Sequence, residues 1–302
     1  MNVVELSGGV GGARMAVGLA RLSTVDLSVV VNVGDDEEIH GLHVSPDIDT
    51  VTYTLAGFQG PEGWGRTEES FRVNTELARF GVDNTFLLGD LDLALNIFRT
   101  SRLSAGDSLS SITEVVASAF NIVPSLRPAS DDRLRTELLV NETDWIGFQD
   151  YFVIRRAQDQ VNKVRFSGEN SAAPAPGVVE SIRRADHVVI APSNPPLSIW
   201  PILSIEGIRE AVVAHPNVTA VSPLIGGRAL KGPADRVLAS LGLPAGNLGV
   251  AKSYHGIINR LVIHSEDAAD AALIDDVEVL TFNTKIKKPN DAERLAREVL
   301  GL

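Results

Sequence analysis

Carboxylates gather in two short segments near the N-terminus of the chain. Four acidic residues run from Asp35 to Glu38, and Asp47 and Asp49 flank an isoleucine within Ser-Pro-Asp-Ile-Asp-Thr at 45–50. In an extended segment, side chains two residues apart point the same way, so Asp47 and Asp49 would repel each other. A cation relieves such repulsion, and Mg²⁺ commonly binds one or two carboxylates plus substrate phosphates. The alternative for both segments is a surface loop with helix-capping aspartates.

A glycine-rich turn precedes these acids and could hold a phosphate. It contains Gly8, Gly9, Gly11 and Gly12, and it lies between a short apolar run and apolar residues at helical spacing. Glycines allow backbone N–H groups at a helix N-terminus to approach a phosphate closely. The spacing is neither G-x-G-x-x-G nor G-K-[ST], so a dinucleotide oxidoreductase or P-loop NTPase is not supported. The turn could also serve only to pack a helix against a strand.

Two later loops carry small polar side chains directly after predicted strands. One holds Ser193, Asn194 and Ser198 among prolines, and the other begins at Ser222. Hydroxyl and amide groups both donate and accept hydrogen bonds, which suits a base, a sugar or a phosphate. Asp90 follows a glycine after another apolar run, where it could face a ligand or cap a helix.

Elements of two kinds must position these residues. Buried apolar runs predict strands over 3–6, 27–33, 86–88, 187–191, 217–221, 261–263 and 277–280, and an antiparallel pair over 138–140 and 148–154. Helical spacing predicts helices over 13–22, 68–80, 108–120, 205–214, 233–241 and 289–300. This order predicts an α/β fold, a Rossmann-like three-layer core with a parallel sheet and an inserted, largely helical cap. The core would take residues 1–65 and 180–302, and the cap residues 66–179.

Composition excludes several classes of protein. The chain has 302 residues, 27 Lys and Arg against 39 Asp and Glu, a formal net charge of −12 and no cysteine. Thiolate catalysis and cysteine metal sites are therefore excluded, and the acidic balance argues against a nucleic-acid partner. No apolar stretch approaches the roughly 18 residues of a membrane helix. The first residues lack the pattern of a signal peptide, so we expect a cytoplasmic protein.

Taken together, the motifs resemble those of the 2-phospho-L-lactate transferase family. The motifs Val-Gly-Gly-Ala and Val-Asn-Val-Gly-Asp-Asp are most similar to those of its actinobacterial, phosphoenolpyruvate-transferring branch. The segments that carry the resemblance run in order from residue 7 to about 255: Ser7–Ala13, Val31–Asp36, Ser45–Thr50, Leu88–Asp90, Phe148–Gln149, Ala191–Pro195 and Ser222–Gly227.

The resemblance implies a reaction and a set of roles. A phospholactyl or phosphoenolpyruvyl group would pass from a GDP-linked donor to the terminal ribityl hydroxyl of the deazaflavin Fo, in biosynthesis of coenzyme F-420, with release of GMP. It also implies a homodimer and a requirement for Mg²⁺. The roles that it implies are Asp47 and Asp49 at the catalytic centre and on the metal, Gly9, Gly11 and Gly12 on the diphosphate, Ser193, Asn194 and Ser198 on guanosine, and Asp90 toward the deazaflavin. Asp35 and Ser222 complete the predicted substrate-binding set.

The sequence departs from the family pattern on the acceptor side. The family reads Gly-Asp-Arg-Asp followed by Ala-Thr-His, whereas this chain has Leu91 in place of the arginine and Leu95-Asn96 in place of Thr-His. Two alternatives therefore stay open. One is the same chemistry on another acceptor alcohol, and the other is a regulatory nucleotide-sugar-binding protein similar to the gluconeogenesis factors.

Overall fold

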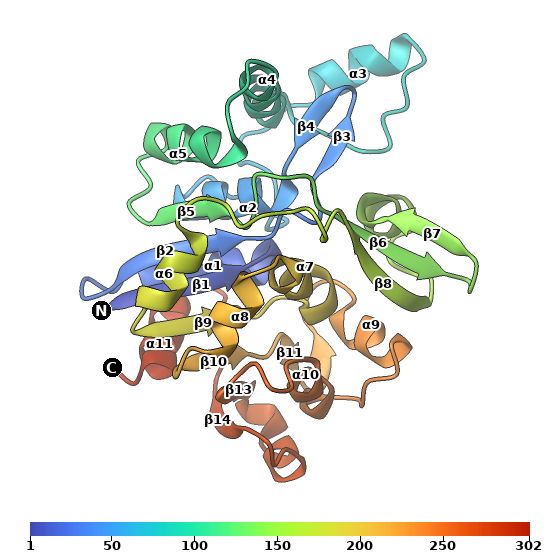
Figure 1. Ribbon diagram of the computed structural model, residues 1–302. Coiled ribbons are helices and arrows are strands. Elements are labelled where there is room, and N and C mark those ends of the chain that lie inside the picture. The colour runs from blue at the N-terminus through green and yellow to red at the C-terminus, as the bar shows by residue number, and fades with distance from the viewer.

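A parallel sheet of seven strands forms the centre of the computed structural model, which describes residues 1–302 (Figure 1). The strands lie in the order β14-β13-β10-β9-β1-β2-β5. Sequence order therefore runs outward in both directions from β1, and the reversal falls between β1 and β9. Ligands of open α/β sheets bind beyond the carboxyl ends of the strands at such a point. The strands are β1 (Asn2–Ser7), β2 (Asp26–Val31), β5 (Ser125–Pro128), β9 (His187–Ile190), β10 (Val218–Val221), β13 (Arg260–His264) and β14 (Glu278–Phe282).

Helices cover both faces of this sheet. In Figure 1, α6 (Val178–Arg184) and α8 (Ile208–Val213) cross the face toward the viewer, and α1 (Gly9–Ala20) lies behind it. On the side of α1, α2 (Pro46–Leu55) and α11 (Pro289–Leu300) both pack against α1. Each central strand is almost wholly buried and mostly apolar, as expected for parallel strands between two helical layers. The predicted α/β class with a parallel sheet is thus confirmed.

Besides α2 and α6, the segment between β2 and β9 contributes two peripheral groups and one strand of the main sheet. The first group is helical and contains α3 (Arg72–Arg79), α4 (Asp90–Ser104) and α5 (Leu109–Ala119). The second is an antiparallel sheet of β6 (Arg135–Val140), β7 (Asp144–Gly147) and β8 (Val161–Ser167) with a small core of its own. Between them, β5 pairs with β2 in the main sheet. The division into a core and an inserted cap stays a prediction, and residues 66–179 include this core-sheet strand.

Smaller elements complete the chain. They are the hairpins β3 (Glu37–Ile39) with β4 (Leu42–Val44) and β11 (Leu224–Ile225) with β12 (Arg228–Ala229), the helices α7 (Trp200–Ser204), α9 (Ala234–Ser240) and α10 (Asn247–Ser253), the π-helical turns η1 (Asp150–Ile154) and η2 (Pro195–Ile199), and the 3₁₀ segment η3 (Ser265–Leu273). No helix combines the length and the apolar character needed to cross a membrane.

Three local predictions are wrong. Residues 86–88 form no strand, and 148–154 contain the turn η1 instead of a strand, so that β7 and β8 are the partners of β6. Asp47 and Asp49 lie in the first turn of α2 rather than in an extended segment. Pro46 stands at the start of that helix, where its fixed φ is favourable and its missing N–H costs nothing. Carboxylates in a first turn are also favoured by the helix dipole.

Candidate functional site

A large cleft lies at the carboxyl ends of β1, β2, β9 and β10. Its volume is about 1240 Å³, beyond the roughly 300–1,000 Å³ typical of a pocket for one small ligand. Nine of the predicted site residues line it: Gly9, Gly11, Asp35, Asp47, Asp49, Ser193, Asn194, Ser198 and Ser222. The sheet therefore brings together segments that lie more than two hundred residues apart in the sequence, such as those of Gly9 and Ser222.

The glycine turn is packed tightly against its surroundings and is also open to the cleft. A Cβ at Gly8 would lie 2.6 Å from the Cβ of Ser198, and one at Gly11 would lie 2.1 Å from the carbonyl oxygen of Pro192. The hydroxyl of Ser193 donates to the carbonyl oxygen of Gly8 at 2.7 Å, which ties the two loops together. Glycine is thus required for packing, and the same close packing brings the N-terminus of α1 to the cleft.

Asp47 fixes the start of α1 with its carboxylate. The N–H of Gly9 donates to Asp47 Oδ1 at 2.8 Å, and the amide of Asn32 donates to Asp47 Oδ2 at 3.0 Å. Burial raises the pKa of Asp47 to about 6, although these two hydrogen bonds oppose the rise. Burial also raises the pKa of Asp35, and the neighbouring charge of Asp47 raises it further. The ionisation of Asp47 therefore makes ionisation of Asp35 less favourable.

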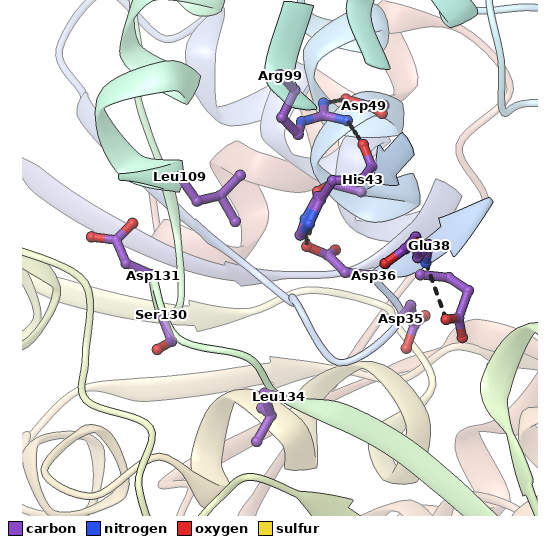
Figure 2. A network of polar contacts seen from close by, with 12 residues as sticks. Asp35, Asp36, Glu38, His43, Asp49, Arg99, Leu109, Ser130, Asp131 and Leu134 are labelled. Carbon is purple, nitrogen blue, oxygen red and sulfur yellow. Dashed lines mark hydrogen bonds and ion pairs between the residues drawn. The ribbon is translucent and has the colours of Figure 1, made fainter. Parts of the chain in front are cut away.

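Asp49 faces the other way, toward α4, and pairs with an arginine that the sequence analysis missed. Arg99 donates to Asp49 Oδ1 and to the carbonyl oxygen of His43, the latter at 3.3 Å (Figure 2). It also donates to Asn96 Oδ1 at 2.7 Å. Asp49 Oδ2 is buried and has no hydrogen-bond partner. Burial raises the pKa of Asp49 to about 7, and Arg99 opposes that rise. A carboxyl group with a pKa near neutrality and one free oxygen suits proton transfer.

Asp36 and Gln149 hold the acidic loop that follows β2. Asp36 Oδ2 accepts from the hydroxyl of Ser45 at 2.8 Å and lies 2.9 Å from Nε2 of His43 (Figure 2). The amide of Gln149 donates to the carbonyl oxygen of Asp35 at 2.8 Å. These contacts fix the backbone that places Asp35 at the cleft, while Asp35 Oδ1 remains buried without a partner.

The loops after β9 and β10 differ in whether their polar side chains already have hydrogen-bond partners within the protein. Both side-chain polar atoms of Asn194 are buried and unpartnered at the cleft, so they can bind a ligand. The hydroxyl of Ser222 instead donates to Asn247 Oδ1 at 2.5 Å and accepts from the N–H of Leu224 at 3.2 Å. Asn247 is held in turn by Asp270. Ser222 thus mainly fixes the conformation of its loop. Asn247 lies 25 residues later in the sequence, and no motif around it indicates that it accepts a hydrogen bond from Ser222.

The opposite wall of the cleft is aromatic and apolar. It includes Tyr53, Trp64, Phe71, Phe86, Leu87 and Leu88, together with Arg66 and Asp92. The hydroxyl of Tyr53 donates to Asp92 Oδ1 at 2.7 Å. A wall of this kind suits a flat ring system with a few polar groups.

Two predicted site residues lie outside the cleft lining. Gly12 packs against Ser7, whose hydroxyl would lie 2.3 Å from an added Cβ. Asp90 begins α4, and its carboxylate accepts from the N–H groups of Arg72 and Val73 at the start of α3. Leu91 is 41% exposed and also lies outside the lining, as does the buried Asn96. The departures from the family pattern therefore do not themselves form the walls of the cleft.

The carboxylates provide a partial site for a divalent cation. No group of three or more acidic or histidine side chains is close enough to bind a metal without other ligands. Asp35 Oδ1 is buried without a partner, and burial, followed by the neighbouring charge of Asp47, raises the pKa of Asp35. Mg²⁺ commonly takes one or two carboxylates and completes its shell with phosphates and water, so this donor set fits Mg²⁺ bound together with a phosphorylated substrate.

Comparisons with known proteins agree over nearly the whole chain. The family model for the 2-phospho-L-lactate transferase CofD matches residues 3–299. A phosphoenolpyruvate transferase of Streptomyces griseus is 42% identical over 286 residues, covering 92% of this chain and 89% of the relative. A 2-phospho-L-lactate transferase of Methanopyrus kandleri is 39% identical over 306 residues, covering 100% and 97%. A crystal structure of a UPF0052 family member from Bacillus halodurans covers 99% of each chain with a TM-score of 0.67 and 17% identity, which confirms the fold.

Proposed function

Because the chain belongs to the CofD family of 2-phospho-L-lactate transferases, we propose that it transfers a phosphorylated three-carbon acid to an alcohol. The donor is a GDP-linked phosphoenolpyruvate or phospholactate, and the acceptor is the terminal ribityl hydroxyl of the deazaflavin Fo. The observation that carries the proposal is one cleft, too large for a single small ligand, whose lining includes the glycine turn, Asp49 and the aromatic side chains.

The chemical step needs a base beside the acceptor hydroxyl. The ribityl oxygen forms a bond to the phosphorus that carries the three-carbon acid, and the bond from that phosphorus to GMP breaks. Asp49 takes the hydroxyl proton through its unpartnered Oδ2, for which a pKa of about 7 is well matched. Arg99 keeps the other oxygen of Asp49 in place, so that the base keeps one orientation.

The remaining residues bind the donor. The N-terminus of α1 presents backbone N–H groups to the diphosphate, and the free amide of Asn194 binds the guanosine part. Mg²⁺ would be held through the unpartnered Oδ1 of Asp35, with the carboxylate of Asp47 beside it, and it would offset negative charge on the phosphate oxygens. Asp49 would then serve as the base and not as a metal ligand. A homodimer also stays a prediction, which light scattering of the purified protein tests.

Incubation with Mg²⁺, Fo and each GDP-linked donor tests the proposal. We expect GMP release together with a product whose mass is that of a phosphodiester of Fo. The Asp49→Asn variant should lower kcat by about 10²-fold or more, the range for loss of a general base. Asp107→Asn is the matched control, because Asp107 pairs with Arg102 at the surface, outside the cleft.

The other outcomes distinguish the alternatives. Donor binding without turnover of Fo would contradict Fo as the acceptor and favour another acceptor alcohol. Absence of both donor binding and turnover would contradict the transferase proposal and favour a regulatory binding protein. Full turnover in Asp49→Asn would remove Asp49 from the proton transfer.

A further inference from the structure

Arg66 lies on a closed loop at the edge of the aromatic wall. Its backbone pairs with Gln59, and the N–H of Thr67 donates to the carbonyl oxygen of Phe58 at 2.8 Å. The N–H of Gly60 donates across the same loop to the carbonyl oxygen of Gly65 at 2.9 Å. These contacts fix the position from which the Arg66 side chain enters the cleft.

Three aromatic rings hold the guanidinium of Arg66. Its central carbon lies 5.5 Å from the ring centroids of Tyr53 and Phe58 and 5.4 Å from that of Phe120. The rings pack edge-to-face on one another, with centroids 6.0 Å apart for Tyr53 and Phe120 and 5.8 Å apart for Phe58 and Phe120. Each ring face attracts a cation, so the guanidinium is oriented before any ligand arrives.

The hydrogen-bonding capacity of this guanidinium is unused within the protein. Arg66 forms no ion pair, its side chain makes no hydrogen bond, and its Nε is buried without a partner. Of the four other cations in the cleft lining, Arg156 and Arg236 also make no hydrogen bond or ion pair, whereas the remaining two are already occupied. Arg14 donates to the carbonyl oxygen of Ile286, and Lys231 donates to that of Glu62. A buried donor of this kind is costly to leave unpaired, so it favours a ligand that supplies an acceptor.

The position of Arg66 along α2 indicates which substrate it meets. Asp47 contacts the glycine turn, and Tyr53, which Arg66 covers, lies six residues further along the helix, about 9 Å at 1.5 Å per residue. Asp49 lies between them. Burial raises the pKa of Asp92, and the hydrogen bond from the hydroxyl of Tyr53 and, to a smaller extent, the positive charge of Arg66 oppose that rise. Arg66 therefore belongs to the apolar, ring-binding side of the cleft and not to the phosphate-binding side.

We propose that Arg66 binds the acceptor substrate, donating hydrogen bonds to an oxygen of its flat ring system on the far side of Asp49 from the glycine turn. Arg66, in the loop before α3, then supplies the positive charge on the acceptor side. The arginine of the family pattern is absent, because residue 91 at the start of α4 is an exposed leucine. Arg66 determines acceptor affinity and takes no part in the proton transfer. This inference rests on the proposed function, since it takes Fo as the acceptor.

Binding and kinetics of Arg66 variants test the inference. Arg66→Met removes the charge and keeps much of the volume, Arg66→Lys keeps the charge without the planar donors, and Arg72→Met is the control because Arg72 is exposed on α3 outside the cleft lining. The dissociation constant of Fo is measured by its fluorescence, that of GDP by calorimetry, and KM for each substrate in the transfer assay. We expect Arg66→Met to weaken Fo binding at least about tenfold, the effect of one lost hydrogen bond to a charged group. GDP binding and the KM of the donor should stay at the wild-type values.

Each other outcome overturns a definite part of the reasoning. Unchanged Fo binding in Arg66→Met, or an equal loss of GDP affinity, would overturn the acceptor-side role while the transferase proposal stands. If Arg66→Met does not fold, Arg66→Lys decides, because wild-type Fo affinity there would show that the planar donors are not used. A wild-type protein that binds GDP-linked donor and not Fo would overturn both this inference and Fo as the acceptor.

Discussion

The ion pair between Arg99 and Asp49 yields a quantitative prediction about both stability and catalysis. The two side chains are 3% and 7% exposed, and Arg99 also satisfies Asn96 Oδ1 and the carbonyl oxygen of His43. Arg99→Met removes the charge and leaves three acceptors without their donor. Removal of one partner of a buried pair typically costs about 3–5 kcal/mol, because an uncompensated charge stays behind. We expect this loss in the free energy of unfolding at pH 8.

The loss should shrink at lower pH. Burial holds the pKa of Asp49 at about 7, raised from its ordinary value even with Arg99 present, and removal of Arg99 raises it further. A raised pKa in the folded state means that stability is fully present below the unfolded pKa and is lost as the pH rises toward the folded pKa. The extra loss in Arg99→Met therefore appears above about pH 7. At pH 5 Asp49 is neutral in both proteins, and only the lost hydrogen bonds remain.

Urea unfolding of a double-mutant cycle measures the effect. The set is wild type, Arg99→Met, Asp49→Asn and the double variant, at pH 5 and pH 8 without added Mg²⁺. The double variant should be more stable at pH 8 than the sum of the two single effects predicts, by about 1–3 kcal/mol. Arg102→Met is the control, since its pair with Asp107 lies at the surface of the same helix and should contribute at most about 1 kcal/mol. Additive single effects, or equal losses at both pH values, would refute the reasoning.

Three further predictions concern residues around the cleft and in the core. Burial raises the pKa of Glu5 in β1, whose two carboxylate oxygens have no hydrogen-bond partner. Between the unfolded and the folded pKa of Glu5, the free energy of unfolding of wild type should therefore fall by about 1.4 kcal/mol per pH unit relative to that of Glu5→Gln, and parallel urea-unfolding profiles of the two proteins from pH 4 to 8 would contradict this. Gly11→Ala places a Cβ against Pro192 and should weaken GDP binding about tenfold or more by calorimetry, whereas unchanged affinity would show that the turn serves only for packing. Asn247→Ala should lower the free energy of unfolding by about 1–3 kcal/mol, because Ser222 loses its acceptor, and thermal unfolding at the wild-type temperature would exclude that role.

The parallel sheet could be predicted from the sequence because its strands carry their own evidence. β1, β2, β9, β10 and β13 are short, mostly apolar runs that are largely buried, and β14 is an apolar run at the edge of the sheet that is partly buried. The helix at 289–300 was predicted at its observed limits, since its apolar residues recur at helical spacing. The loops that follow these strands could be predicted as site residues for the same reason, because the carboxyl ends of parallel strands share one edge.

The parts of the site that were missed depend on tertiary contacts. The interpretation of Asp47 and Asp49 as one extended pair fails because Pro46 starts a helix, in which residues two apart point to different sides. α4 went unrecognised because its mean hydropathy is near neutral and only three of its fifteen residues are buried. Arg99 therefore had no predicted element to carry it toward Asp49. Arg66 likewise depends on rings from α2, from residue 58 and from the end of α5, which no local spacing connects.

The two departures from the family pattern differ in what they can change. Leu91 is exposed and lies outside the cleft lining. As an apolar side chain it cannot make the contacts to a ligand that the arginine of the family pattern could make from this position. Asn96 is buried and accepts from Arg99, which in turn holds Asp49. A substitution at 96 would thus act on the orientation of the base and appear in kcat, whereas a substitution at 66 would act on acceptor affinity and appear in the dissociation constant of Fo. In the proposed mechanism, orientation of the base and recognition of the acceptor thus belong to different side chains, Arg99 with Asn96 for the first and Arg66 for the second.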